Sequence, residues 1–301
     1  MSWRTIYITE SERLSLYLDS LMIIKNGEEY KIPLKDIGSI ILEDNRTSLT
    51  VKLMNKISEY NILLIFCDDK YNPSTMIFPL NNYFRQYKTV NEQINWDNNL
   101  KKILWKEIVK VKLENQKEIL RKLKKTEETI KLLEKYITEV KEDDLENREG
   151  LGAKIYFREL FGENFTRGNN DVINSALNYG YTIFNSKISR IIASKGLLTY
   201  LGIHHKNEYN QFNLSSDIIE VFRPIVDYYI YLYLKDSEYF AREDRIELIN
   251  LLNSKIKYNS YNEYVYNAME KYIEFIIEFF KTGKFYDNKM PYLEKIEFYE
   301  L

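Results

Sequence analysis

The chain has 301 residues, of which 45% are hydrophobic and 29% charged, and this composition excludes a disordered or fibrous protein. The single cysteine, Cys67, excludes an intramolecular disulfide and a zinc site built on several thiolates. The net charge of −2 argues neither for nor against a nucleic-acid partner. Since no secretory signal or long apolar run is visible, we expect a cytoplasmic protein without a membrane partner.

The first 79 residues contain short runs of strand length. These runs cover residues 3–9, 21–25, 28–32, 37–43 and 62–67. Asn26-Gly27 lies between the second and third runs, and this dipeptide tolerates the positive φ angles of a type I′ hairpin turn. Apolar residues at helical spacing around 49–57 predict one short helix. We therefore predict a small β-rich domain over residues 1–79.

The chain after Pro79 is predicted to be helical. The 70 residues before Gly150 contain neither Gly nor Pro, and their apolar residues approximate a helical period. We expect long helices here, with one break where a basic block, 101–125, gives way to an acidic one. Further helices are predicted at 151–161, 171–195, 216–234 and 261–282. The predicted architecture is an α+β multidomain protein, with a linker or first helix at 80–99 and a larger all-α domain at 100–301.

The only two histidines, His204 and His205, are followed by two acids at helical spacing. Asp217 and Glu220 are three residues apart, which puts both carboxylates on one helix face. An imidazole and two carboxylates form a reasonable ligand set for Mg²⁺ or Mn²⁺. The alternative is a surface histidine pair with a helix-capping aspartate and a solvent-facing glutamate. We expect Ser215 or Ser216 to cap this helix and Pro224 to interrupt or end it.

A third carboxylate, Glu149, falls in the first turn of a helix that Asn147 can cap. It is either a metal ligand or a complement to the helix dipole. Lys154 and Arg158 are four residues apart on the same helix, where they can bind a phosphate or pair with Glu159. The segment 171–181 adds Asn174 and Tyr179, each a possible contact to phosphate or base.

Three segments together carry a resemblance to a known family. NREGLGAKIYF (147–157), DVINSALNYGY (171–181) and HHKNEYNQFNLSSDIIEVFRP (204–224) resemble, in order and spacing, the signature blocks of the CRISPR adaptation integrase family. The opening SWRTIYIT and the strand LLIFCDDK are similar to its type II branch. The resemblance covers essentially the whole chain. It implies a β-sandwich-like N-terminal domain before a helical catalytic domain.

The resemblance also implies the site. Its metal ligands, which are also its catalytic residues, map onto Glu149, His205 and Glu220, and Asp217 is a further candidate ligand or supporting residue. His205 and not His204 is implied, because the family's histidine directly precedes the KN-x-x-NQFN stretch. The implied cofactor is Mg²⁺ or Mn²⁺. The candidate DNA contacts are Lys154, Arg158, Arg167, Asn174, Tyr179, Lys187 and Arg190.

The implied activity is that of a metal-dependent DNA endonuclease and integrase. The 3′-hydroxyl of a short DNA fragment would attack a phosphodiester at the edge of a CRISPR repeat. The implied partners are double-stranded DNA (the spacer fragment and the CRISPR repeat), a second copy of the chain as a homodimer, a small ferredoxin-like companion protein and the type II RNA-guided effector nuclease. The alternatives are a helical DNA-binding or scaffold protein with a decayed site, and an adaptor surface in residues 261–301.

Overall fold

The computed structural model describes residues 4–77 and 85–298, and the chain forms two compact units. The first contains the chain up to Gln86 together with Ala193–Leu197. The second contains Tyr87–Ile192 and the chain from Leu198 onward. The predicted boundary at residue 79 falls outside the described residues, and the predicted domain limits stay predictions.

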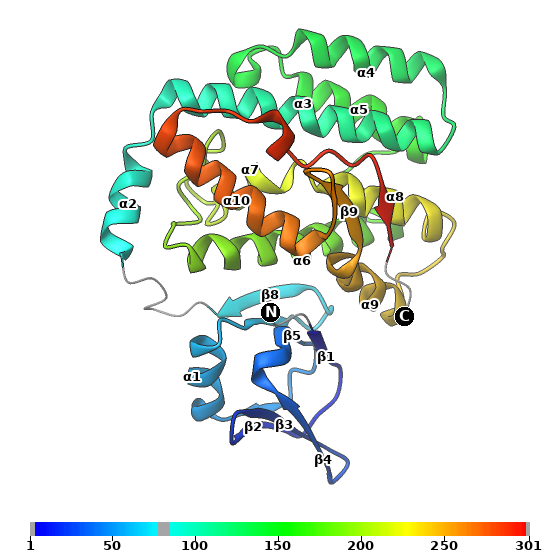
Figure 1. Cartoon of the computed structure of the whole chain (residues 1–301). Helices are drawn as coiled ribbons and strands as arrows, with labels where there is room; N and C mark the ends of the chain where they lie inside the picture. The colour runs from blue at the N-terminus through cyan, green and yellow to red at the C-terminus, as the bar shows by residue number, and fades with distance from the viewer. Residues whose placement is uncertain (1–3, 78–84, 299–301) are drawn as a thin grey trace. The chain divides into compact units, whose positions relative to one another are not determined.

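The first unit is built from two four-stranded sheets and one helix (Figure 1). One sheet has the order β1-β5-β7-β8, and its first three strands are parallel neighbours. The other has the order β4-β3-β2-β6. The strands are β1 (Arg4–Ile8), β2 (Arg13–Tyr17), β3 (Ser20–Lys25), β4 (Glu28–Pro33), β5 (Ile37–Leu42), β6 (Ser48–Leu49), β7 (Leu63–Cys67) and β8 (Pro73–Ile77).

Local sequence signals explain several of these elements. Asn26 and Gly27 have φ angles of 52° and 76°, which confirms the predicted hairpin turn between β3 and β4. Helix α1 (Val51–Glu59) begins after Thr50, whose hydroxyl accepts a hydrogen bond from the amide of Leu53. The sequence pattern missed strands β2, β6 and β8, which are short or poor in apolar residues.

A single core joins the two sheets of the first unit. Leu14 and Leu21 from one sheet and Ile40 and Leu64 from the other belong to the same buried cluster, together with Leu53 of α1. Strand β5 is buried at five of its six positions, and β2 contributes its buried residue Leu14 to the same cluster. The predicted sandwich-like N-terminal fold is confirmed.

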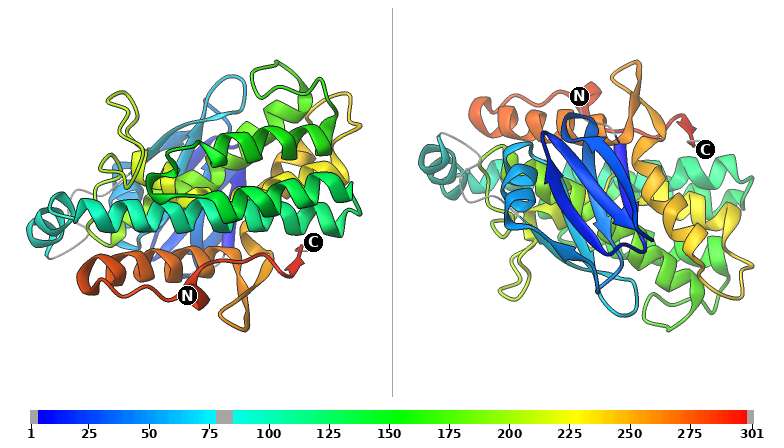
Figure 2. Two further views of the ribbon diagram at one scale, coloured as in Figure 1. Left: turned by 90° about the horizontal axis from the view of Figure 1, so that it is seen from above. Right: turned by 90° about the horizontal axis from the view of Figure 1, so that it is seen from below.

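The second unit is mostly helical. Its helices are α2 (Gln86–Ile94), α3 (Asn98–Lys122), α4 (Glu127–Glu139), α5 (Arg148–Phe161), α6 (Val172–Ser194), α7 (Asn213–Ile219), α8 (Arg223–Tyr233), α9 (Arg242–Asn250) and α10 (Val265–Thr282). Figures 1 and 2 show α3, α4 and α5 running side by side, and the three helices contact one another. Among the described residues, no helix combines the length and the apolar character needed to cross a membrane.

The helix breaks follow from particular residues. The predicted break near the change of charge sign is confirmed between α3 and α4. The predicted helix 216–234 is wrong, because the structure has two helices there. Pro224 lacks the amide hydrogen that would continue the helix from Glu220, and α8 starts with Pro224 in its first turn. The predicted capping by Ser215 or Ser216 is also wrong, since α7 begins at Asn213 and places Ser215 inside the helix.

Three short strands accompany the helices of the second unit. Strand β9 (Lys255–Tyr258) pairs antiparallel with β10 (Tyr261–Tyr264) and with β11 (Ile296–Glu297). The helix predicted from residue 261 therefore starts only at Val265. Its predicted end is confirmed, because Gly283 follows α10 with a φ of 68°.

The buried side chain of Asn115 joins α3 to two other segments. Its amide nitrogen donates to the carbonyl of Val221 (2.8 Å) and to that of Pro291 (3.0 Å). Its carbonyl oxygen accepts from the amide of Leu293 (2.9 Å). Asn115 thus fixes the bend between α7 and α8, which carries Glu220, against the helix that carries Lys112.

Candidate functional site

Helices α3 and α5 and the α7–α8 bend bring two carboxylates to one lysine. The ammonium of Lys112 donates to Glu149 in the first turn of α5 and to Oε2 of Glu220 (2.5 Å). Arg223, one turn after Glu220, contacts its other oxygen, Oε1, at 3.1 Å. Lys112 and Glu220 are both almost fully buried, so these ion pairs form in a low-dielectric environment.

The electrostatics of the cluster favour its charged state. Burial by itself would lower the pKa of Lys112, but Glu220 and Glu149 outweigh burial and raise it. The pKa of Glu149 is lowered, chiefly by Lys112 and further by Arg223 and His205, against the opposing effect of burial. Glu149 is therefore held ionised, as a metal ligand must be.

Asp217 orients His205. Its Oδ1 accepts from Nδ1 of the His205 ring (2.6 Å) and from the His205 amide (3.1 Å). A carboxylate can only accept a hydrogen bond, so the ring proton lies on Nδ1 and Nε2 presents its lone pair. The hydrogen bond to Asp217 also raises the pKa of His205.

The other oxygen of Asp217 is also fully used. Oδ2 accepts from the amides of Ile203 (2.6 Å) and His204 (3.1 Å), and the Asp217 side chain is completely buried. A carboxylate has about four acceptor positions, and all four are occupied here. Asp217 is therefore placed as a support for the loop and the ring of His205, and the alternative that it is itself a ligand is not favoured.

His204 has a different environment. Its Nδ1 contacts Asp143 (3.0 Å), and its ring stacks on Trp105 with a centroid distance of 4.3 Å. The ring of His205 meets Trp105 edge-on at 5.6 Å. The charge of Glu220 contributes to raising the pKa of His205, and His205 contributes to lowering the pKa of Glu149. Of the two histidines, His205 is the one whose charge interacts with Glu149 and Glu220, although it lines a separate cavity from the one that Glu149 lines.

The donor set suits a hard divalent cation. In the described ranges 4–77 and 85–298, no three carboxylate, imidazole or thiol side chains are grouped closely enough to hold a metal ion. Two carboxyl groups nevertheless meet at the ammonium of Lys112, so the space between them accepts positive charge. With His205 oriented by Asp217, these residues fit Mg²⁺ or Mn²⁺ in donor chemistry.

Gly202 lies against the Asp217 hydrogen bonds, where a side chain has no room. A Cβ at this position would lie 2.4 Å from the carbonyl oxygen of His205 and 2.9 Å from Oδ2 of Asp217. We expect Gly202→Ala to lower the free energy of unfolding by roughly 1–3 kcal/mol, measured by urea denaturation. The matched control is Gly168→Ala, because nothing lies within 4 Å of a Cβ there. Equal stability of the two variants would contradict this account.

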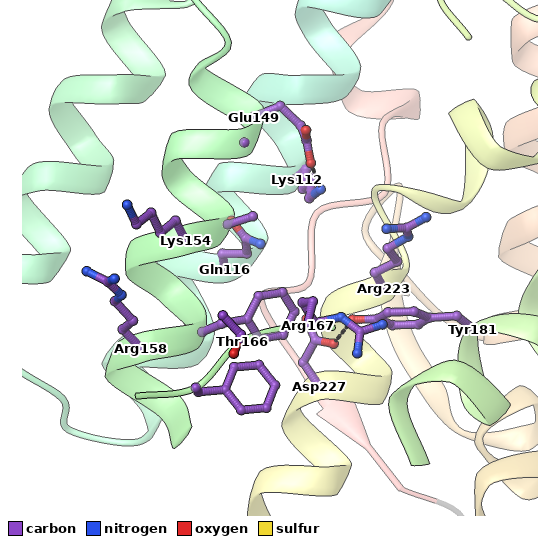
Figure 3. Close-up of a pocket in the computed structure, with 14 residues that line it drawn as sticks. Lys112, Gln116, Glu149, Lys154, Arg158, Thr166, Arg167, Tyr181, Arg223 and Asp227 are labelled. Atoms are coloured by element: carbon purple, nitrogen blue, oxygen red, sulfur yellow. Dashed lines mark hydrogen bonds and ion pairs between the residues drawn. The ribbon is translucent and has the colours of Figure 1, made fainter. Parts of the chain in front are cut away.

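A cavity of about 490 Å³ opens beside the carboxylates (Figure 3). Lys154 and Arg158 line the cavity from α5. Arg167, Tyr181 and Arg223 line the opposite wall. Glu149 and Lys112 also line it, so the ion-pair cluster forms part of the cavity wall. Five of the fourteen residues that line the cavity are Lys or Arg and two are acidic, and basic side chains gathered on a concave surface attract phosphate groups.

The far wall of the cavity is a network around Asp227. The hydroxyl of Tyr181 donates to Asp227, and burial raises the pKa of this carboxyl to about 7. The guanidinium groups of Arg167 and Arg223 lie 5.5 and 4.9 Å from the centre of the Tyr181 ring. Both arginines are thereby held by an aromatic ring next to the carboxylates.

Several predicted DNA contacts are corrected by the structure. Asn174 is buried and accepts from Arg167 while it donates to the carbonyl of Thr166, so it positions Arg167 instead of reaching DNA itself. Tyr179 is only 1% exposed and packs against Phe240. Arg190 is also buried, and burial lowers its pKa to about 10. These three side chains are interior residues.

The remaining candidates differ in position. Burial lowers the pKa of Lys187 to about 8, and its ammonium lies 5.6 Å from the ring of Tyr266. Lys187 does not line the cavity, whereas Lys154, Arg158 and Arg167 do. The structure therefore gathers three of the seven predicted DNA contacts beside the carboxylates.

Sequence reasoning missed Lys112, the residue that joins the two carboxylates. Lys112 and Asn115 fall on the buried stripe of α3 that also contains Ile108 and Ile119. A lysine and an asparagine at helical spacing within an apolar stripe are a detectable signal, since unpaired polar groups are rarely buried. That signal identifies the positions, but the partners of the two side chains come from other parts of the chain.

Comparisons with known proteins agree with this architecture. The sequence profile of the family described as CRISPR associated protein Cas1 matches residues 6–244. The chain is 38% identical over 232 residues to the CRISPR-associated endonuclease Cas1 of Neisseria meningitidis, covering 75% of this chain and 74% of that protein. It is 27% identical over 303 residues to the CRISPR-associated endonuclease Cas1 1 of Francisella tularensis subsp. novicida, covering 91% and 94%.

Solved structures show the same fold. A Cas1 protein from Thermotoga maritima superposes with a TM-score of 0.76 at 16% identity, covering 93% of this chain and 97% of that one. A casposase bound to integration product gives a TM-score of 0.76 at 19% identity, covering 98% and 96%. At these identities the likeness concerns the fold alone. The predicted α+β class is confirmed.

Proposed function

The chain belongs to the family of CRISPR associated protein Cas1, and from this premise we propose that it is a metal-dependent DNA endonuclease and integrase of CRISPR adaptation. It would insert short DNA fragments at a repeat by attack of a 3′-hydroxyl on a phosphodiester. The observation that supports this most directly is that Glu149 and Glu220 meet at Lys112, and that Glu149 and Lys112 line a cavity together with four further basic residues. A casposase bound to integration product shares the fold.

Glu149, Glu220 and Nε2 of His205 are the proposed holders of Mg²⁺ or Mn²⁺. When bound, such an ion activates the attacking hydroxyl or water and stabilises the negative charge of the departing oxygen. Neighbouring residues of the chain hold these proposed ligands in position. Asp217 keeps the ring proton of His205 on Nδ1, and Arg223 fixes one oxygen of Glu220. Asn115 holds the bend that carries Glu220.

Lys154, Arg158 and Arg167 are the proposed phosphate contacts. The first two are exposed on α5 within reach of the cavity, and Asn174 and Asn178 hold the guanidinium of Arg167. Cations here would orient the strand and offset the charge that develops on the attacked phosphate. Transfer of a 3′-hydroxyl gives integration, and attack by water at the same centre gives cleavage.

The basic block 101–125 is less suited to this role than its charge suggests. Lys110, Lys117 and Arg121 pair with glutamates of the same unit, and Lys122 donates to carbonyls of residues 293 and 294. These pairings indicate that the basic side chains of residues 101–125 stabilise the fold. They leave the cavity cations as the better candidates for binding DNA.

We expect Lys154→Gln combined with Arg158→Gln to weaken DNA binding and to flatten its salt dependence. Removing one cation that binds a phosphate should reduce the slope of log affinity against log salt by about 0.9. Fluorescence anisotropy with a labelled duplex between low and moderate salt measures the slope. Lys110→Gln combined with Lys117→Gln removes the same charge from α3 and should leave the slope nearly unchanged. An unchanged slope in the first variant would exclude these cations as phosphate contacts.

We propose a homodimer that assembles with a small ferredoxin-like companion protein and, in the type II setting, with the RNA-guided effector nuclease. Two insertions at the two ends of one repeat require two active sites held apart. One chain of a Cas6-RT-Cas1–Cas2 complex contains the same fold, with a TM-score of 0.75 at 18% identity, covering 98% of this chain and 36% of that one. Light scattering that finds a monomer at micromolar concentration, with and without the companion, would refute the dimer.

Strand transfer tests the proposed function directly. A labelled DNA fragment is incubated with a repeat-bearing plasmid, the protein, its companion and Mn²⁺ or Mg²⁺. Joining of the label to the plasmid, abolished by a chelator, is the expected result. DNA binding with neither joining nor cleavage would favour the alternative, a DNA-binding or scaffold protein with a decayed site.

A further inference from the structure

Lys112 occupies the position of a cation between the two carboxylates. It lies in the middle of α3, its side chain is 4% exposed, and it contacts Glu149 and Glu220 at the same time. A lysine buried to this degree needs partners of opposite charge, and here those partners are the two proposed metal ligands. A divalent ion would have to share the same oxygens with it.

The charges of the cluster already balance. Lys112 and Arg223 supply two positive charges, and Glu149 and Glu220 supply two negative ones. A divalent ion added to this balanced set would leave two positive charges without partners in a largely buried place. Such an imbalance is costly at low dielectric, so the ion needs either added anions or the withdrawal of the ammonium.

The cavity offers Lys112 a second set of partners. Lys112 lines the 490 Å³ space together with Lys154 and Arg158, the proposed phosphate contacts. A DNA phosphate in that space would bring negative charge next to the ammonium. The phosphate would then compensate Lys112 while the carboxylates turn to the divalent ion.

We propose that Lys112 is a positioning residue that competes with the divalent ion for Glu149 and Glu220 in the DNA-free protein, so that metal and DNA bind cooperatively. The inference rests on the proposed function, because that function supplies both ligands. Lys112 holds the two carboxylates together when no metal is bound, and with Arg223 it balances their charge. Coupling of this kind is reciprocal, so metal should tighten DNA binding by the factor by which DNA tightens metal binding.

The test is Mn²⁺ affinity, measured by isothermal titration calorimetry on the full chain. Lys112→Gln removes the competing charge, and we expect the DNA-free variant to bind Mn²⁺ at least about tenfold more tightly than the unmodified protein. A duplex that ends in 3′-dideoxynucleotides should strengthen Mn²⁺ binding to the unmodified protein much more than to the variant. Lys135→Gln is the matched control, because it removes one charge from an exposed pair with Glu139 on α4.

Thermal melting provides the second readout. In chelator, Lys112→Gln should melt below the unmodified protein, since two neighbouring carboxylates lose their shared cation. Mn²⁺ should then raise its melting temperature by more than it raises that of the unmodified protein. If the Gln variant does not fold, Lys112→Met, whose side chain matches most of the buried lysine stem, takes its place in both measurements.

The outcomes separate this inference from the function on which it rests. Equal or weaker Mn²⁺ binding by the folded Lys112 variant would overturn the competition and leave the metal site intact. A tenfold gain in the Lys135→Gln control as well would show a general charge effect and also overturn it. Absence of Mn²⁺ binding in both proteins, with and without DNA, would overturn the proposed metal site and the competition together.

Discussion

Replacing Glu149, His205 or Glu220 by alanine is expected to reduce strand transfer and cleavage by more than about 10³-fold while DNA binding persists. An ion held by few protein ligands depends on each of them, so losing one should remove most of the bound metal. DNA affinity rests on several separate phosphate contacts. Losing a carboxylate also leaves Lys112 with one partner fewer, so DNA affinity measured in chelator should stay level or rise.

The adjacent histidine gives this prediction its internal control. His204→Ala removes a ring that stacks on Trp105 and contacts Asp143, and it should retain far more activity than His205→Ala. Strand transfer and duplex binding are measured in parallel on all four variants, with circular dichroism to confirm folding. Equal loss at both histidines would mean that the loop had merely been destabilised. Full activity of Glu149→Ala would exclude it as a ligand.

Much of the fold could be predicted because its signals are local. The Asn26-Gly27 turn, the cap at Asn147 and the stop at Gly283 each depend on a few neighbouring residues, and the structure has all three. The single helix predicted over 216–234 failed because helical periodicity continues across Pro224, whereas the backbone hydrogen bonds do not. Strand β10 was missed because its pairing with β9 and its packing are tertiary properties.

The site was less accessible to sequence reasoning than the fold. Spacing placed Asp217 and Glu220 on one helix face, but α7 ends at Ile219, before Glu220, and the two carboxylates have different partners. Lys112 is 37 residues from Glu149 and 108 from Glu220, so no local pattern connects it with them. Burial of Asn174 and Tyr179 depends on the packing of α6, which their residue types do not reveal.

Asp217→Asn is expected to weaken Mn²⁺ affinity and strand transfer by roughly 10–100-fold, although the proposed ligands all remain. The asparagine has one acceptor oxygen where the aspartate has two, and its NH₂ group would face two backbone N–H donors. The buried donors left unpaired should cost about 2–4 kcal/mol of folding free energy. The ring of His205 would also lose the carboxylate that keeps its proton on Nδ1, so Nε2 would no longer be held as an acceptor.

A positioning role predicts a pattern that simple destabilisation does not. Raising the Mn²⁺ concentration should restore part of the activity of Asp217→Asn but none of the activity of Glu220→Ala, because only the second variant lacks a ligand. The matched control is Asp143→Asn, which alters the partner of His204 in the same way, at 3.0 Å from its Nδ1. Asp143 has a φ of 61°, a conformation that asparagine tolerates well, so this variant should fold normally. If Asp143→Asn lost as much Mn²⁺ affinity as Asp217→Asn, the two pairs would be equivalent, and the assignment of His205 as the metal-facing histidine would fail.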